Sequence, residues 1–219
     1  MSAFLFPEIG IHFKLLIFAT VEIIHNVIEG LINTSPIEWA GVLLGTCYLI
    51  FIAYKNRWGW YFAMASTAVY TYLCYTVGLY IESGLQVFYF VMAIYGWISW
   101  NKTTNKDQKI IRWPLKYHVL NLGVSALVTY LLGYLMVTYT DQQNPYLDAF
   151  STVFSLVATY MVTQRVLENW IYWIVIDTAL IFLYSSRGMD LTGFHYLVYT
   201  VIAIFAFNSW YKMYKAQNN

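Results

Sequence analysis

Two stretches of the sequence, "YFVMAIYGWISW" at 89–100 and "YTVIAIFAFNSW" at 199–210, decide how the chain is organised. Six of their twelve positions are identical, and the stretches lie 110 residues apart. At the same offset, residues 38–100 align with residues 148–210 without a gap, with nine identities in 63 positions. The gap-free register predicts an internal duplication.

The composition predicts a membrane protein. Of the 219 residues, 60% are hydrophobic and only 11% are charged, whereas soluble domains average about 25% charged residues. The few basic residues form no stripe for nucleic acid, so no nucleic-acid partner is expected. Cys47 and Cys74 lie in separate apolar segments, which argues against a disulfide framework or a zinc site. No cofactor and no metal are expected.

Seven segments are long and apolar enough to cross a bilayer, which takes about 20 residues of helix. They fall into an all-α integral membrane plan of 3+1+3 helices. Three spans leave the chain on the opposite side of the membrane, and the single linking helix returns it to the starting side, so the two three-helix repeats are parallel. The segments are 38–54, 58–80, 84–101, 117–139, 147–164, 168–186 and 193–214. The domains are an N-terminal helix (1–35), the first repeat (36–101), a loop and linking helix (102–146), and the second repeat with a tail (147–219).

The N-terminal segment, about 9–32, leaves two alternatives open. Glu22, His25 and Glu29 form one polar stripe on an otherwise apolar helix. Such a helix lies at the membrane interface, or it spans with the stripe turned toward protein or water. The sequence also leaves homo-oligomerisation open.

The basic residues predict the orientation. When the chain is traced from residue 38 through the seven segments, every later Lys and Arg except Arg187 falls on one side. Basic residues gather on the cytoplasmic side of membrane proteins. We therefore expect a multi-pass membrane protein with the 101–116 loop and the C-terminus in the cytoplasm.

Asp177 is the acid that most needs an explanation. It shares a helix face with Trp170 and Trp173, and it lies near the middle of a membrane segment that has no Lys or Arg at similar depth. A carboxylate there costs about 3 kcal/mol on insertion scales. Either a hydroxyl such as that of Thr67 or Tyr72 binds a neutral Asp177, or the counter-charge arrives with the solute. In the second case, the two indoles suit an aromatic cation.

Further candidate site residues lie on the last helix of each repeat, where every third or fourth residue shares one face. The small residues on these faces, Gly96, Ala203 and Ala206, either allow close helix packing or leave room for a ligand. Trp100 and Trp210 are either membrane-interface anchors or part of the site. The full set of candidate binding residues is Trp173, Asp177, Trp170, Gln86, Asn208, Tyr89, Tyr196, Tyr199, Trp97 and Trp100.

These features resemble the PnuC family of bacterial vitamin transporters over about residues 37–212. The resemblance is carried by the 3+1+3 plan, by "NWIYWIVID" at 169–177, and by the repeat ends "YGWISW" and "FAFNSW". It implies a fold like that of the SWEET sugar transporters. It also implies uptake of nicotinamide riboside, a precursor for pyridine nucleotide biosynthesis, by facilitated diffusion with trapping by cytoplasmic phosphorylation. By this resemblance Trp170, Trp173 and Asp177 match the binding motif.

Two departures affect the expected substrate. The family motif often has Asn at the position of Asp177 and Gly at the position of Ala206. A thiamine-like cation or another vitamin or nucleoside therefore stays open as an alternative, as does proton coupling through Asp177 or Glu22. An enzyme is not expected, because the histidines are scattered and no HExxH or GxSxG occurs. A retinal photoreceptor is disfavoured because the last segment has no lysine at its middle.

Overall fold

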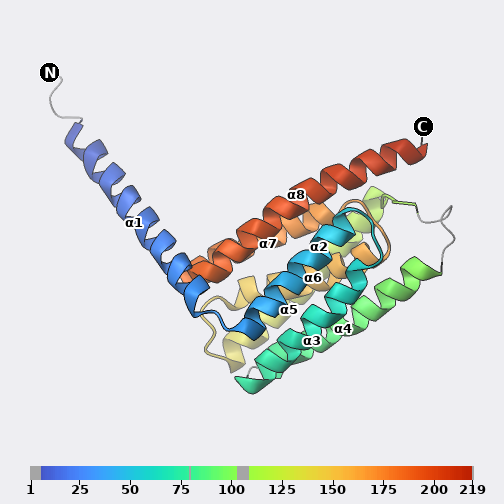
Figure 1. The fold of residues 1–219 in the computed structure, drawn as a ribbon, viewed down its shortest axis with the longest axis horizontal. Coiled ribbons are helices and arrows are strands. Elements are labelled where there is room, and N and C mark those ends of the chain that lie inside the picture. The colour runs from blue at the N-terminus through green and yellow to red at the C-terminus, as the bar shows by residue number, and fades with distance from the viewer. Residues whose placement is uncertain (1–5, 79, 103–108, 219) are drawn as a thin grey trace.

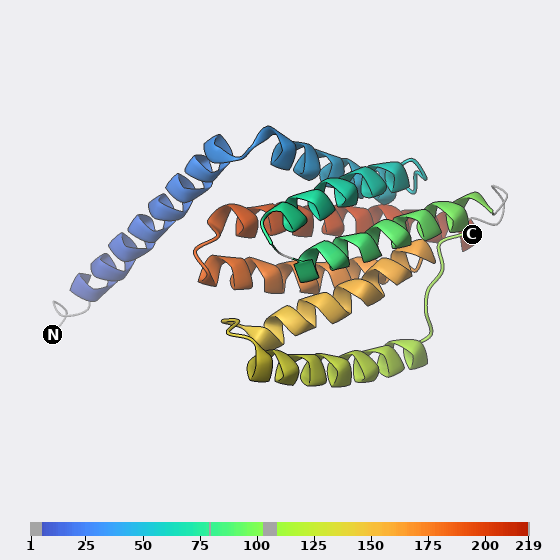
Figure 2. The same ribbon diagram turned by 90° about the horizontal axis from the view of Figure 1, so that it is seen from below.

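The computed structural model describes residues 6–78, 80–102 and 109–218, and these are almost entirely helical. This confirms the all-α class. The helices are α1 (Phe6–Asn33), α2 (Pro36–Ala53), α3 (Gly59–Thr76), α4 (Tyr80–Asn101), α5 (Leu115–Tyr139), α6 (Pro145–Thr163), α7 (Asn169–Ser186) and α8 (Asp190–Asn218). Seven of them form one bundle, and α1 projects away from it (Figures 1 and 2). Lys106, one of the basic residues that orient the chain, lies outside the described residues.

The start of α2 is fixed by local sequence. Pro36 occupies the first turn, where its missing N–H has no partner to lose. The Ser35 hydroxyl accepts a hydrogen bond from the Glu38 backbone N–H at 3.3 Å, and the Glu38 carboxylate accepts one from the Ser35 N–H at 2.8 Å. This reciprocal pair is a capping box. It holds Glu38 at the end of the bundle where α2 begins.

The bundle contains two groups of three helices that contact each other through their first and last helices. Consecutive helices pack together in α2–α3–α4 and again in α6–α7–α8. Between these groups, α8 packs on α2 and α4 packs on α6, so the last helix of each group contacts the first helix of the other. The linking helix α5 lies on α6 at the outside of the bundle (Figure 2). Helix α1 packs on α8, where the Asn26 amide donates to Asp190 at 2.9 Å.

Backbone conformation matches at positions 110 residues apart. Lys55 and Arg165 are the non-glycine residues with positive φ in the described chain, at 54° and 60°. Gly78 and Gly188 have φ of 82° and 69°. Positive φ is uncommon outside glycine, so its occurrence at both Lys55 and Arg165 indicates that the two turns have the same backbone conformation. The same turns therefore end the same helices in both groups.

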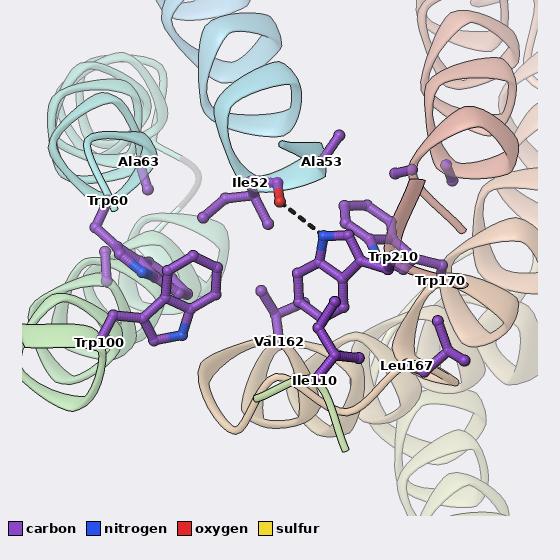
Figure 3. Packing of buried hydrophobic residues seen from close by; sticks show 13 residues of the cluster. Ile52, Ala53, Trp60, Ala63, Trp100, Ile110, Val162, Leu167, Trp170 and Trp210 are labelled. Carbon is purple, nitrogen blue, oxygen red and sulfur yellow. Dashed lines mark hydrogen bonds between the residues drawn. The ribbon is translucent and has the colours of Figure 1, made fainter. Parts of the chain in front are cut away.

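Four tryptophans form the centre of the core at the end of the bundle opposite Glu38 (Figure 3). Trp60 meets Trp100 edge-on at 5.4 Å and 89°, and Trp170 meets Trp210 at 5.5 Å and 89°. Trp60 and Trp170 are matched positions, as are Trp100 and Trp210. The two pairs therefore have the same geometry, in addition to the same residue type.

The Trp100 and Trp210 indoles join the two groups of helices. Trp100 Nε1 donates to the Thr163 carbonyl at 3.1 Å. Trp210 Nε1 donates to the Ile52 carbonyl at 2.9 Å, as the dashed line in Figure 3 shows. Both side chains are at most 1% exposed. The interpretation of Trp100 and Trp210 as membrane-interface anchors is therefore wrong. Their N–H groups satisfy helix-end carbonyls inside the protein rather than headgroups.

Three described helices are long and apolar enough by length and composition to cross a membrane: α2, α5 and α8. Many large apolar side chains on the outside of the bundle are exposed, including Leu43, Leu127 and Phe205. A surface of this kind is typical of a protein whose outer face meets lipid. The chain is a multi-pass membrane protein.

Candidate binding cavity

A cavity of about 590 Å³ lies between the two groups of helices. Pockets for small ligands typically have about 300–1,000 Å³. Glu38 and Trp39 lie at the end where α2 begins, and Trp60 lies at the opposite end, where α3 begins. The cavity therefore runs along the bundle from the start of α2 toward the four-tryptophan cluster. Residues from both groups line it, so neither group forms it alone.

Five of the candidate residues from the sequence lie together in the lining. They are Gln86, Tyr89, Trp173, Tyr196 and Tyr199. Gln86 and Tyr196 are matched positions, as are Tyr89 and Tyr199. The last helix of each group therefore presents the same two positions to the cavity.

The structure places four other candidates outside the lining. Trp170 and Trp100 are in the buried tryptophan cluster, and Trp97 packs at its edge against the Tyr61 ring at 5.8 Å. Asn208 is exposed on α8. Trp170 shares a helix face with Trp173, but it lies in the tryptophan cluster against the Trp210 ring and is not among the described lining residues.

Asp177 lies directly behind the wall of the cavity. Its side chain is 3% exposed, and none of the described residues gives it a hydrogen bond. It is close enough to the Tyr196 and Tyr199 hydroxyls to interact with them electrostatically. Both tyrosines line the cavity. Burial of a polar group is costly, so Asp177 stays a candidate for interaction with a solute in the cavity.

The hydroxyl partners expected for Asp177 are engaged elsewhere. Thr67 Oγ1 donates to the carbonyls of Ala63 and Met64 at 2.8 and 3.1 Å. Tyr72 is 58% exposed on the outside of α3. Neither residue hydrogen-bonds Asp177 in the structure.

The sequence analysis of helix faces missed that α2 and α3, the first two helices of the α2–α4 group, also line the cavity. They add hydroxyl groups to the lining, from Thr46, Tyr48, Ser66, Thr67 and Tyr70. Gly45 makes room for this wall, because a Cβ there would lie 2.8 Å from the Tyr199 hydroxyl. The signal in the sequence was the pair Gly41 and Gly45, one turn apart on an otherwise bulky helix.

His195 also lines the cavity, although the sequence showed only scattered histidines. Its ring packs edge-on against Tyr199 at 4.2 Å. His195 Nε2 and Trp60 Nε1 are buried atoms of the lining with no hydrogen-bond partner among the described residues. Two unpaired nitrogen groups, several hydroxyls and the Trp173 indole suit a solute with a flat ring and polar substituents.

The lining has no Lys or Arg among the described residues. Glu38 is its one acidic residue, and Asp177 lies behind it. Burial of an anion without a positive partner is strongly unfavourable. The cavity therefore suits a cationic or neutral solute better than an anionic one.

An all-helical membrane protein with a cavity between two groups of helices, lined by apolar side chains and several hydroxyl groups, has the architecture of a solute transporter. Residues 35–212 match the family described as nicotinamide mononucleotide transporter. The chain belongs to this family of transporters, and the resemblance to the PnuC family and the expectation that the chain is not an enzyme are both confirmed.

Two relatives match most of this chain and most of their own length. The nicotinamide riboside transporter PnuC of Escherichia coli (strain K12) is 24% identical, with 81% of this chain and 86% of the relative covered. The riboflavin/roseoflavin transporter RibM of Streptomyces davaonensis is 25% identical, with 80% and 84% covered. A crystal structure of the vitamin B3 transporter PnuC superimposes with a TM-score of 0.71 at 20% identity, and covers 91% of this chain and 93% of that one.

Proposed function

We propose that this chain takes up nicotinamide riboside across the bacterial inner membrane. The observation that carries the proposal is the cavity, whose lining combines the Trp173 indole with a hydroxyl-rich wall, together with the buried Asp177 close to two of the lining tyrosines. Nicotinamide riboside has a pyridinium cation, a carboxamide and a ribose. The indole suits the pyridinium ring, for which a desolvated cation–π contact contributes about 2 kcal/mol. Gln86 suits the carboxamide, and the tyrosines suit the ribose.

The charge of the solute separates nicotinamide riboside from nicotinamide mononucleotide, the two pyridine solutes that the family and the relatives are named for. Nicotinamide mononucleotide has a phosphate in addition to the pyridinium. No Lys or Arg of the described lining would meet that phosphate, and phosphate sites in proteins depend on such partners or on helix N-termini. The riboside lacks the phosphate, so we infer that it is the preferred of the two.

The architecture that we propose is 3+1+3, with α2–α4 and α6–α8 as two parallel repeats in a SWEET-like arrangement and α5 as the linking helix. The equal geometry of the two tryptophan pairs and the matched positive-φ turns support it. With the basic residues in the cytoplasm, the four-tryptophan cluster lies at the cytoplasmic end and the Glu38 end of the cavity faces outward.

We propose facilitated diffusion with trapping by cytoplasmic phosphorylation, with no coupling to an ion. Proton coupling through Asp177 is the alternative mechanism. Uptake of labelled nicotinamide riboside into proteoliposomes, measured with and without an imposed pH gradient, separates the two. Equal initial rates support facilitated diffusion, and a rate that follows the gradient supports proton coupling.

Riboflavin is a second candidate solute, because the relative RibM is named for it. A calorimetric panel of nicotinamide riboside, nicotinamide mononucleotide, riboflavin and thiamine against the purified protein tests the substrate. We expect the riboside to bind at least tenfold more tightly than the others, which corresponds to about 1.4 kcal/mol. Tighter binding of riboflavin or thiamine would replace the proposed substrate.

A further inference from the structure

The first helix of each repeat has an acidic residue in its first turn, and the two acids have different environments. Glu38 and Asp148 are matched positions. Asp148 is neutralised by Arg187, whose Nη2 lies 2.5 Å from Asp148 Oδ2. The position that matches Arg187 in the first repeat is Val77, which is 69% exposed. The first repeat therefore has the acid without the cation that pairs with it in the second.

Glu38 is left at the mouth of the cavity. Its side chain lines the cavity next to Trp39, whereas Asp148 is not among the described lining residues. No Lys, Arg or His forms an ion pair with Glu38 in the part of the chain that the structure describes. One carboxylate oxygen accepts the Ser35 N–H, which fixes the side chain at the start of α2.

The other ionisable side chains in the lining do not compensate this charge. Tyr70 lies close enough to Glu38 for an electrostatic interaction, and His195 lies on α8. A cleft lined by charge of one sign raises the local concentration of the opposite ion. A charge at the entrance acts on the rate at which ligands enter and on their discrimination, more than on the strength of final binding.

We propose that Glu38 is a specificity-determining residue that attracts cationic solutes into the cavity at its outer mouth. This inference rests on the proposed function, because it needs a cationic solute. It assigns separate tasks to the two acids of the site. Glu38 acts on a cation in water at the entrance, and Asp177 acts on it in the dry interior.

The substitution Glu38→Gln tests this role with little effect on the fold. A capping box accepts Gln in place of Glu at this position, so α2 keeps its start while the charge is removed. Glu82→Gln is the matched control. Glu82 is an exposed acid in the first turn of α4, at the same end of the bundle, and it does not line the cavity.

The measurement is the initial rate of nicotinamide riboside uptake into proteoliposomes at low substrate concentration. Salt is set at about 20 mM and about 500 mM, which changes the screening length from about 20 Å to about 4 Å. Attraction between unit charges across about 7 Å of water corresponds to about a threefold effect. We expect Glu38→Gln to lower the rate about threefold at low salt and to match the wild-type rate at high salt, with Glu82→Gln unchanged at both.

An uncharged solute gives the decisive comparison. The reduced dihydropyridine form of nicotinamide riboside has the same substituents without the cation, and Glu38→Gln should leave its uptake unchanged. An equal loss for the charged and the reduced solute, or no loss for either, would overturn the role of Glu38 while the proposed function stands. A wild-type protein that takes up no nicotinamide riboside would overturn the proposed function itself, and the inference with it.

Discussion

Replacement of Trp173 by Leu separates a binding tryptophan from a packing tryptophan. Trp173 lines the cavity and also packs at the edge of the core. Leu keeps an apolar side chain at the site but removes the π surface. A desolvated cation–π contact contributes about 2 kcal/mol, and each 1.36 kcal/mol is tenfold in affinity. We expect the affinity for nicotinamide riboside to fall at least tenfold and toward about 30-fold.

The assay is calorimetric titration of the purified variant, with thermal unfolding as the measure of stability. Trp97→Leu is the matched control, because Trp97 packs at the same core cluster and against Tyr61 but lies outside the cavity lining. We expect Trp97→Leu to lower stability and leave affinity unchanged. Trp173→Phe should recover part of the affinity, since it restores an aromatic face. If Trp173→Leu binds as wild type does, Trp173 is a packing residue and the proposed stacking is refuted.

Three further predictions follow from the buried acid, the indole N–H groups and the turns. Asp177→Leu should abolish binding of nicotinamide riboside while the protein stays folded, as judged by calorimetry and thermal unfolding; unchanged affinity would remove Asp177 from the site. Trp100→Phe and Trp210→Phe each remove an indole N–H donor from a carbonyl that keeps a second donor, the Ser99 hydroxyl at Thr163 and the Lys55 N–H at Ile52, and should each lower the unfolding free energy by about 0.5–1.5 kcal/mol; an effect in only one variant would contradict equivalent roles. Gly78→Ala and Gly188→Ala should each cost about 1–2 kcal/mol because of their positive φ, whereas Gly84→Ala, inside α4 with open space around it, should stabilise by about 1 kcal/mol; denaturation in detergent measures all three.

The helical plan and half of the candidate site could be predicted from the sequence, because both depend on local periodicity. The spacing of Gln86 and Tyr89, and of Tyr196 and Tyr199, places each pair on one helix face, and those faces do line the cavity. Asp177 was singled out because an acid in an apolar helix needs a reason. These inferences use one helix at a time and need no knowledge of how helices pack.

The missed features depend on packing between helices. Trp170 and Trp173 share a face, yet of the two only Trp173 is among the described lining residues, and Trp170 packs against the Trp210 ring in the core. In the loop after α4, Ile111 pairs with Val166 in the turn between α6 and α7, and Arg112 binds Glu168 at 2.6 Å. That contact raises the pKa of Arg112 through the Glu168 hydrogen bond and charge. No local pattern indicates contacts over such sequence separations.

The two proposed repeats share a backbone but differ where they face the solute. The matched positions Ala63 and Trp173 both line the cavity, one with a methyl group and the other with an indole. Likewise, Thr67 in the lining matches Asp177 behind it. A symmetric lining would offer two equivalent orientations to a bound molecule. Trp173 and Asp177 have no aromatic or acidic side chain at the matched positions, and Glu38 lines the cavity whereas Asp148 binds Arg187. We therefore infer that the proposed solute, with a cationic ring at one end and a sugar at the other, binds in a single orientation.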